Sequence, residues 1–306
     1  MKILILGARG LLGSNLSLLY SKNHDVLAAG KNKPNFTFTK NYVVDISKEE
    51  DLEIIEREKP DFVINCVALT NVDFCEENFE LSREINALAA EKIAKACKKE
   101  NSYFVHISTD AVFDGNKGNY KETDSVNPIN VYGETKLEAE KLIETVGGRY
   151  SIVRTNIYGW NHLEKFSLAE WMLNKLRKME KIHAFSDIHS SPINVINLGR
   201  AIMELFEKKY QGVIHISGAE TSSKFNFAKK IAKIFNLNDK LIIESSSDTM
   251  NFKAKRGKNL GLNVDFAKNL LETKLFGIEE GLKELKEEEE SDFLKKLKNR
   301  RFKNYQ

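Results

Sequence analysis

The chain has 306 residues, and its 47 basic and 44 acidic side chains leave a formal net charge of only +3. This balance excludes a strongly basic surface, so we expect no nucleic-acid partner. No apolar run approaches the roughly 20 residues that a membrane span needs, and the apolar start is too short for a signal peptide. We therefore predict a cytoplasmic protein without membrane contact. Three cysteines without a CxxC pair predict reduced thiols and no metal site.

A glycine-rich turn lies close to the start of the chain. Residues 3–6 are apolar and predict a buried parallel strand. The following turn leads into a helical pattern, so backbone N–H groups at a helix N-terminus can meet a pyrophosphate. A plain tight turn is the alternative. The predicted dinucleotide contacts in this turn are Gly7, Arg9, Gly10, Leu11, Leu12 and Gly13.

The second predicted strand, residues 24–29, bears on the choice of cofactor. A site for NAD usually has an acidic residue at the end of this strand, which hydrogen-bonds the ribose 2′-hydroxyl. Here Gly30 and Lys31 follow the strand instead. Lys31 and Arg9 are suited to pair with a 2′-phosphate, which favours NADPH over NADH. Solvated surface cations are the alternative.

Residues 42–44, 62–67 and 103–107 predict three further strands. The last of them ends at Ser108 and Thr109. Because open α/β sheets bind their ligands at the carboxyl ends of the strands, we expect these two hydroxyl groups at the site.

Tyr132 and Lys136 lie four residues apart in a predicted helix that follows Pro128, so they share one face of it. A free phenol has a pKa of about 10, and a neighbouring ammonium group lowers that pKa. Tyr132 can then exchange a proton with a carbonyl or alcohol oxygen, which a hydroxyl such as that of Thr109 can hold. A chance pair is the alternative, and the glycine turn argues against it.

These features resemble the extended short-chain dehydrogenase/reductases, and among them the dTDP-4-dehydrorhamnose reductases. The resemblance rests on three motifs and covers the chain from Met1 to about Leu285. The motifs are Gly7-x-x-Gly10-x-x-Gly13, Ser108-Thr109-Asp110-Ala111-Val112-Phe113-Asp114-Gly115 and Tyr132-x-x-x-Lys136.

The resemblance implies an α/β fold, with a Rossmann doubly wound parallel sheet and a smaller C-terminal α/β substrate domain. Residues 1–158 would form the NAD(P)-binding domain, with residues 194–212 returning to it. Residues 159–193 and 213–306 would form the substrate domain. The implied activity is NAD(P)H-dependent reduction of the 4-keto group of a nucleotide-linked deoxysugar, as in dTDP-rhamnose and polysaccharide biosynthesis.

The resemblance also implies the roles of individual residues. The catalytic set is Thr109, Tyr132 and Lys136. Further cofactor contacts would come from Lys31, Asp45, Ile46, Val67, Ala68, Leu69, Ser108, Tyr132 and Lys136, although Asp45 is equally suited to cap a helix. The substrate contacts would be Thr109, Asp110, Val112, Phe113, Asn156 and Arg256.

The chain departs from the dTDP-4-dehydrorhamnose reductases at Ala111, where an aromatic residue is usual, and at Ile157, where Trp is usual. Both positions neighbour the sugar pocket, so the identity of the sugar stays open. Residues 253–259 resemble a basic loop beside the substrate diphosphate; a solvated charge run is the alternative. In a second loop, His189 is either a ligand contact or a solvated side chain. A charged helix over residues 279–303 would pack on the body or mediate a homodimer.

Two other functions remain open on the sequence alone. A nucleotide-sugar epimerase or dehydratase of the same fold would use an additional acidic residue, for which Asp110 beside Thr109 is a candidate. A regulatory subunit such as the β-subunit of methionine adenosyltransferase resembles the same family. Oxidation of NADPH with a 4-keto sugar nucleotide would separate these functions.

Overall fold

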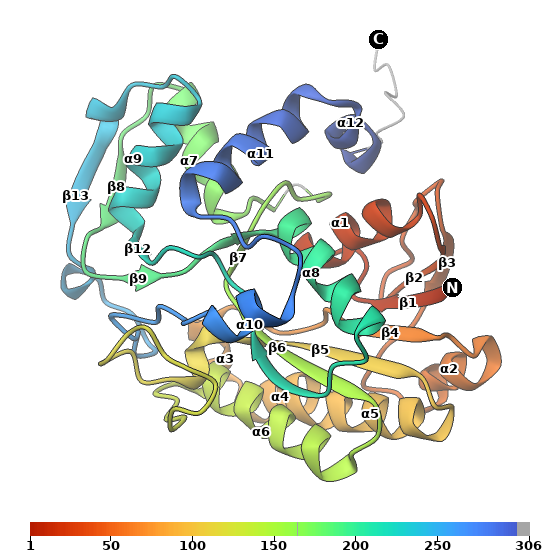
Figure 1. Ribbon diagram of the computed structural model, residues 1–306. Helices are drawn as coiled ribbons and strands as arrows, with labels where there is room; N and C mark the ends of the chain where they lie inside the picture. Colours follow the sequence, from red (N-terminus) through yellow and green to blue (C-terminus); the bar gives the residue numbers. More distant parts are fainter. Residues whose placement is uncertain (164, 299–306) are drawn as a thin grey trace.

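Seven parallel strands form the central sheet of the computed structural model, which describes residues 1–163 and 165–298 (Figure 1). In spatial order they are β11 (Gly212–His215), β6 (Tyr150–Thr155), β5 (Tyr103–Thr109), β4 (Phe62–Asn65), β1 (Lys2–Leu6), β2 (Asp25–Gly30) and β3 (Lys40–Val43). The strand order reverses between β1 and β4. Such a switch point opens a crevice at the carboxyl ends of the strands, which is where ligands bind in this fold.

Helices cover both faces of the sheet, as the alternation of buried side chains along its strands requires. Ile3 and Ile5 of β1 pack on one side, and Leu4 and Leu6 pack on the other. The first side is covered by α1 (Leu11–Tyr20), α8 (Val195–Glu207) and α10 (Asp265–Leu270). The second is covered by α2 (Glu53–Glu58), α5 (Ala89–Lys99) and α6 (Val131–Val146). The predicted doubly wound fold is confirmed.

Three shorter helices join β4 to α5 along this second side (Figure 1). They are α3 (Val72–Glu77), α4 (Phe79–Arg83) and the π-helical η2 (Glu84–Leu88). Asn86 of η2 is buried, and its side chain hydrogen-bonds the backbone N–H of Leu69, 2.8 Å away, in the segment that follows β4.

A smaller lobe with its own apolar core lies beside the carboxyl ends of the strands (Figure 1). There β8 (Ile182–Phe185) pairs in parallel with β13 (Ile242–Ser245). The helices packed in this core are α7 (Leu168–Arg177), α9 (Lys224–Ile234), α11 (Ile278–Glu290) and α12 (Asp292–Lys298). Two short strand pairs connect the lobe, namely β7 (Ile157–Tyr158) with β10 (Ile193–Asn194) and β9 (His189–Ser190) with β12 (Ser222–Ser223). The remaining 3-10 turns are η1 (Glu50–Leu52), η3 (Asp110–Val112), η4 (Asp239–Leu241) and η5 (Ser247–Thr249).

Two sequence predictions need correction. Residues 213–215 were assigned to the substrate domain, but β11 pairs with β6 and so extends the central sheet. Residues 279–303 were predicted as one helix, but Ser291 has an extended backbone and separates α11 from α12. Residues 299–303 of that prediction lie outside the described residues. Within residues 1–163 and 165–298, every helix falls short of the length and apolar character that crossing a membrane requires.

Candidate active site

A cavity of about 660 Å³ lies at the carboxyl ends of β1, β4, β5 and β6 and is closed on one side by the smaller lobe. Predicted site residues form much of the sheet-side wall. They are Gly10, Leu11, Leu12, Val67, Ala68, Ser108, Thr109, Asp110, Tyr132 and Asn156. Loops of the lobe supply the opposite wall, in which Arg256 is the predicted residue and His189 also lies.

The glycine turn forms a close-packed cradle at the start of α1. A Cβ atom on Gly13 would lie 2.4 Å from the carbonyl oxygen of Gly7, and Gly7 itself has a φ of +80°, so both positions require glycine. No side chain caps α1, and its first turn has no acidic residue. The N-terminus of α1 therefore offers backbone N–H groups and a positive dipole end to an anion. This geometry fits the pyrophosphate of a dinucleotide.

Thr109 and Tyr132 meet at the cavity wall. Thr109 ends β5, and its Oγ1 accepts a hydrogen bond of 3.1 Å from the backbone N–H of Ala111, which fixes the side chain at the start of η3. Asn130 caps α6 by accepting from the N–H of Gly133, 2.9 Å away, and this places Tyr132 in the first turn of the helix. Burial raises the pKa of the Tyr132 phenol to about 12, against a smaller lowering by the neighbouring Thr109 hydroxyl. Tyr132 is therefore protonated at neutral pH.

Lys136 lies beneath the cavity wall, with an exposed fraction of 1%. Its Nζ is 2.8 Å from Nε2 of His106 and donates to the carbonyl oxygen of Ile107, also 2.8 Å away. Burial lowers the pKa of Lys136 to about 7, against the opposing effect of Glu140. Lys136 shares a helix face with Tyr132, as predicted, but its amino group is directed to β5.

Ser108 has a different role from Thr109. Its Oγ donates a 2.5 Å hydrogen bond to Oε1 of Glu140. Glu140 is also paired with Arg154, whose Nη2 is 2.6 Å from Oε2, and both side chains are almost fully buried. The Ser108 hydroxyl is thus engaged by a buried ion pair, and Thr109 supplies the hydroxyl that faces Tyr132.

Asp110 adds a buried carboxyl group to the cavity wall. Its Oδ2 accepts a 2.9 Å hydrogen bond from Nδ2 of Asn156, and its Oδ1 accepts from Thr109 Oγ1 at 3.2 Å. Burial raises the pKa of Asp110 to about 6. Asp110 and Asn156, each predicted as a substrate contact, therefore form a pair next to the Thr109 and Tyr132 hydroxyls.

Val112 and Phe113 do not line the cavity, which corrects their prediction as substrate contacts. They are 0% and 1% exposed and belong to a small apolar cluster, in which the Phe113 ring stacks on Tyr120 with 4.2 Å between centroids. Val112 lies in the 3-10 turn η3 that follows β5, and Phe113 follows this turn with an extended backbone; both side chains pack into the cluster instead of the cavity.

The predicted adenine end of the cofactor site lies outside this cavity. Lys31 forms an ion pair with Asp45, with 3.0 Å between Nζ and Oδ2, and this pairing lowers the pKa of Asp45. Ile46 is 4% exposed and packs in the core of the sheet, which argues against a wide contact with a ligand. Arg9 makes no hydrogen bond or ion pair with the residues that the structure describes. Its role and that of Leu69 stay predictions.

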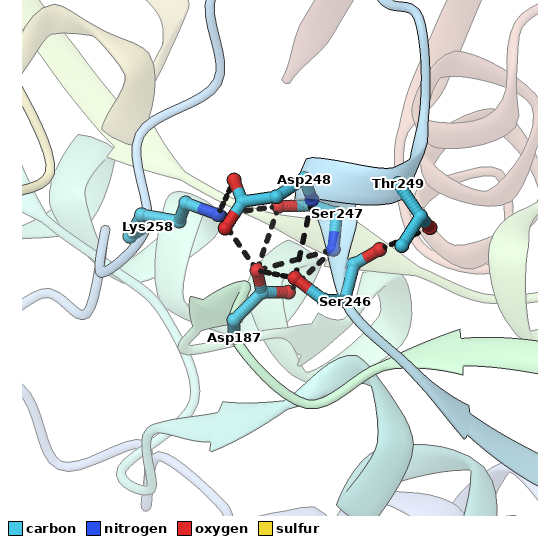
Figure 2. A network of polar contacts seen from close by, with 6 residues as sticks. All are labelled: Asp187, Ser246, Ser247, Asp248, Thr249 and Lys258. Carbon is cyan, nitrogen blue, oxygen red and sulfur yellow. Dashed lines mark hydrogen bonds and ion pairs between the residues drawn. The ribbon is translucent and has the colours of Figure 1, made fainter.

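The basic loop is held mainly by acidic residues. Figure 2 shows Lys258 among Asp187, Asp248 and Ser247, with 2.6 Å between its Nζ and Oδ2 of Asp187. Asp187 also accepts hydrogen bonds from Ser246 Oγ and from the backbone and side chain of Ser247. This network joins the loop after β8 to the loop after β13 and to the basic loop.

Of the four cations predicted to face the substrate, Arg256 alone lines the cavity. Lys253 pairs with Glu77 and Lys258 with Asp187, so their charges are already compensated. Arg256 is itself 3.0 Å from Oδ1 of Asp73 and stacks over Phe252, which fixes its guanidinium group. Lys255 is exposed and does not line the cavity.

Lys224 is a site residue that the sequence analysis missed. It lies in the cavity wall at the start of α9, and its ammonium group forms no hydrogen bond or ion pair with any described residue. Burial lowers its pKa, with a further lowering by Arg256 and an opposing effect of Asp110. The sequence feature that could have identified Lys224 is its position directly after the capping Ser223. A cation at a helix N-terminus is unfavourable next to the positive end of the helix dipole, and a bound anion would stabilise both.

This combination of a doubly wound sheet, a glycine cradle and a Thr–Tyr–Lys set is that of an extended short-chain dehydrogenase/reductase. The family described as "RmlD substrate binding domain" matches residues 1–291, and the chain belongs to this family.

Three relatives illustrate the range of the similarity. A probable low-salt glycan biosynthesis reductase, Agl14 of Haloferax volcanii, is 30% identical over 248 residues, which are 79% of this chain and 82% of the relative. The structure of dTDP-4-dehydrorhamnose reductase from Bacillus anthracis in complex with NADP has a TM-score of 0.84 and 28% identity, covering 94% of this chain and 99% of the other. Methionine adenosyltransferase 2 subunit beta of Danio rerio is 27% identical over 270 residues, 85% of this chain and 82% of the relative.

Proposed function

We propose that the protein is an NAD(P)-dependent oxidoreductase that reduces the 4-keto group of a nucleotide-linked deoxysugar. The observation that carries this proposal is that the hydroxyl of Thr109 and a protonated Tyr132 lie together in the wall of the cavity, which Gly10 of the glycine cradle also lines. The reductase names of relatives that span most of the chain support it.

The cofactor would be held by residues at the switch point of the sheet. Gly10, Leu11 and Leu12 offer the N-terminus of α1 to the pyrophosphate, and Val67 and Ala68 line the cavity after β4. When bound, the nicotinamide supplies the hydride. NADPH is the proposed form, because Arg9 and Lys31 are suited to a 2′-phosphate. The pairing of Lys31 with Asp45 makes Arg9 the stronger candidate of the two.

The chain supplies the proton. Tyr132 has a pKa of about 12 and so carries its proton at neutral pH, as an acid that serves a ketone oxygen must. Thr109 neighbours the phenol in the cavity wall, where its hydroxyl can hold the same ketone oxygen. Asp110 and Asn156 form the adjoining wall, where they can orient sugar hydroxyl groups.

The diphosphate of the substrate is assigned to the lobe-side wall. Lys224 and Arg256 are both in this wall, and a charge-assisted hydrogen bond to a phosphate contributes about 1.5–3 kcal/mol. Arg256 has its own carboxylate partner in Asp73, whereas Lys224 has none among the described residues. We therefore assign the larger share of phosphate binding to Lys224. A homodimeric state and a cytoplasmic location stay predictions from the sequence.

Two other functions are outcomes of the same test. An epimerase or dehydratase would draw on Asp110, whose raised pKa suits a proton donor. A regulatory subunit, as the similarity to methionine adenosyltransferase 2 subunit beta would favour, needs no turnover. The test is NADPH oxidation with dTDP-4-dehydrorhamnose, followed at 340 nm with product analysis. Stoichiometric oxidation supports a reductase, conversion without net oxidation supports an epimerase or dehydratase, and binding without conversion supports a regulatory protein.

A further inference from the structure

A buried chain of three side chains runs beneath the cavity from Lys136 to the end of β4. Lys136 Nζ is 2.8 Å from Nε2 of His106, and Nδ1 of His106 is 3.3 Å from Nδ2 of Asn65. Oδ1 of Asn65 accepts a 3.0 Å hydrogen bond from the backbone N–H of Val67. All three side chains are at most 1% exposed, so the hydrogens of this chain must be matched within the protein.

The orientation of Asn65 fixes the hydrogens on His106. A backbone N–H can only donate, so the carbonyl oxygen of Asn65 must face Val67 and its NH₂ group must face the imidazole. Nδ1 of His106 is then an acceptor, and the neutral ring carries its hydrogen on Nε2. That hydrogen points at Lys136 Nζ, which can accept it only as an amine with a free lone pair.

This pattern of donors and acceptors is incompatible with a charged Lys136. An ammonium group can only donate, so Nε2 would have to accept and the ring hydrogen would move to Nδ1. Two donors would then face each other across the 3.3 Å between His106 and Asn65. Rotating the Asn65 amide by 180° would only transfer the conflict to the N–H of Val67.

We propose that Asn65 and His106 are positioning residues that hold Lys136 as a neutral amine in the cofactor-free protein. Its other neighbours do not supply a free negative charge that would favour an ammonium group. Glu140, one turn further along α6, is paired with Arg154. Burial raises the pKa of the Cys66 thiol to about 12, so that group is neutral, as is Tyr132.

The consequence for catalysis rests on the proposed function. An ammonium group beside a phenol favours the phenolate, whereas a neutral amine leaves the phenol protonated. A reductase needs Tyr132 in its protonated form at the start of the reaction. By keeping Lys136 neutral, the amide of Asn65 leaves Tyr132 in the protonated form that reduction of a ketone requires.

The direct test is ¹⁵N NMR of the full-length, cofactor-free protein labelled at its six histidines, recorded near pH 8. Nitrogen shifts distinguish the two neutral tautomers and the charged ring. The His106 signal is assigned by its loss in His106→Gln. We expect His106 to carry its hydrogen on Nε2. A hydrogen on Nδ1, or a charged ring, would overturn the proposal whether or not the protein is a reductase.

A second experiment reverses the donors and acceptors along the chain of Asn65, His106 and Lys136. In Asn65→Asp, one carboxylate oxygen still accepts from Val67 and the other accepts from Nδ1–H, so Nε2 becomes an acceptor for an ammonium group. The pKa of Lys136 should then rise. Because an ammonium group beside Tyr132 favours the phenolate, the apparent pKa above which kcat/KM for keto-sugar reduction is lost should fall by about one unit or more. Asn197→Asp is the control, because Asn197 is equally buried but hydrogen-bonds Lys274 and Phe276 on the α8 side.

The outcomes separate the two proposals. An unchanged profile in Asn65→Asp, with the tautomer reversed by NMR, would refute the link between His106 and catalysis. Absence of keto-sugar reduction by the wild-type protein would refute the proposed function and leave the NMR result to decide the state of Lys136. If Asn65→Asp does not fold, the wild-type NMR spectrum still decides it.

Discussion

The sheet-side and lobe-side walls of the cavity are built in different ways. On the sheet side, neighbours in the sequence hold the functional side chains: Thr109 binds the N–H of Ala111, and Asn130 binds that of Gly133. On the lobe side, a residue distant in the sequence holds Arg256, whose Nη2 is 3.0 Å from Oδ1 of Asp73. Lys224 in the same wall has no hydrogen-bond or ion-pair partner for its ammonium group among the described residues. The chemistry is thus positioned by local backbone geometry, whereas the charges at the substrate end are positioned by the tertiary fold.

The largest expected effect belongs to the sheet-side wall. Tyr132→Phe keeps the ring and removes the acidic proton, so kcat for keto-sugar reduction should fall by about 10² or more. The Kd for NADPH, from fluorescence titration, should change little. Tyr42→Phe is the matched control, because Tyr42 hydrogen-bonds Glu58 at the edge of the sheet. Near-normal turnover in Tyr132→Phe would remove the proposed acid.

The next effect belongs to the lobe-side wall. Lys224→Met should raise KM for the nucleotide sugar by roughly tenfold to a hundredfold, since a charge-assisted contact contributes about 1.5–3 kcal/mol. Added salt should weaken substrate binding to the wild-type protein in the same direction. Lys229→Met on the same helix is the control, because Lys229 pairs with Asp239. An unchanged KM would place the diphosphate elsewhere.

A third test concerns Asp110, where the two walls meet. Its folded-state pKa of about 6 lies above the unfolded value of about 3.9. Its contribution to stability is therefore fully present below about pH 4 and falls as the pH rises to about 6. The amide in Asp110→Asn does not titrate, so the free energy of unfolding of this variant should not fall over this pH range. The difference in free energy of unfolding, variant minus wild type, should therefore be about 1–3 kcal/mol larger at pH 7 than at pH 4.

Chemical denaturation at the two pH values measures this difference for Asp110→Asn. If the stability difference between Asp110→Asn and wild type is the same at pH 4 and at pH 7, the pKa of Asp110 is not raised. The same variant tests the alternative chemistry: loss of sugar conversion by 10² or more would favour a dehydratase-type role for Asp110.

The smallest effect is expected at Lys258, which lies in the polar network of Figure 2. Its side chain is 45% exposed, and exposed ion pairs contribute about 0–1 kcal/mol. Lys258→Met should lower the melting temperature slightly and leave KM for the sugar nucleotide nearly unchanged. A rise in KM as large as that of Lys224→Met would show that the basic loop binds substrate after all.

The sequence predicted the sheet-side wall well because short-range spacing determines it. Gly7 and Gly13 meet in one turn, and Tyr132 follows an N-cap whose partner is three residues away. The same approach failed at Phe113, since nothing local distinguishes a side chain that turns into a core from one that faces a pocket.

The lobe-side wall and the buried support of Lys136 could not be predicted from local patterns. The density of cations in residues 253–258 was visible, but the acids that compensate them lie far away in the sequence. Lys224 follows the capping Ser223, but only the fold places it in the cavity wall near Asp110. His106 lay in an apolar strand, and its contact with Lys136 depends on the packing of α6 on β5.

The central claim is that the sheet-side wall performs the chemistry and the lobe-side wall binds the substrate. The most direct test measures kcat and KM of Tyr132→Phe and Lys224→Met side by side, with NADPH and dTDP-4-dehydrorhamnose. We predict that Tyr132→Phe loses activity in kcat with a KM near that of wild type, and that Lys224→Met loses it in KM with kcat largely kept. If Lys224→Met instead lowers kcat as strongly as Tyr132→Phe and leaves KM unchanged, this division of roles between the two walls is wrong.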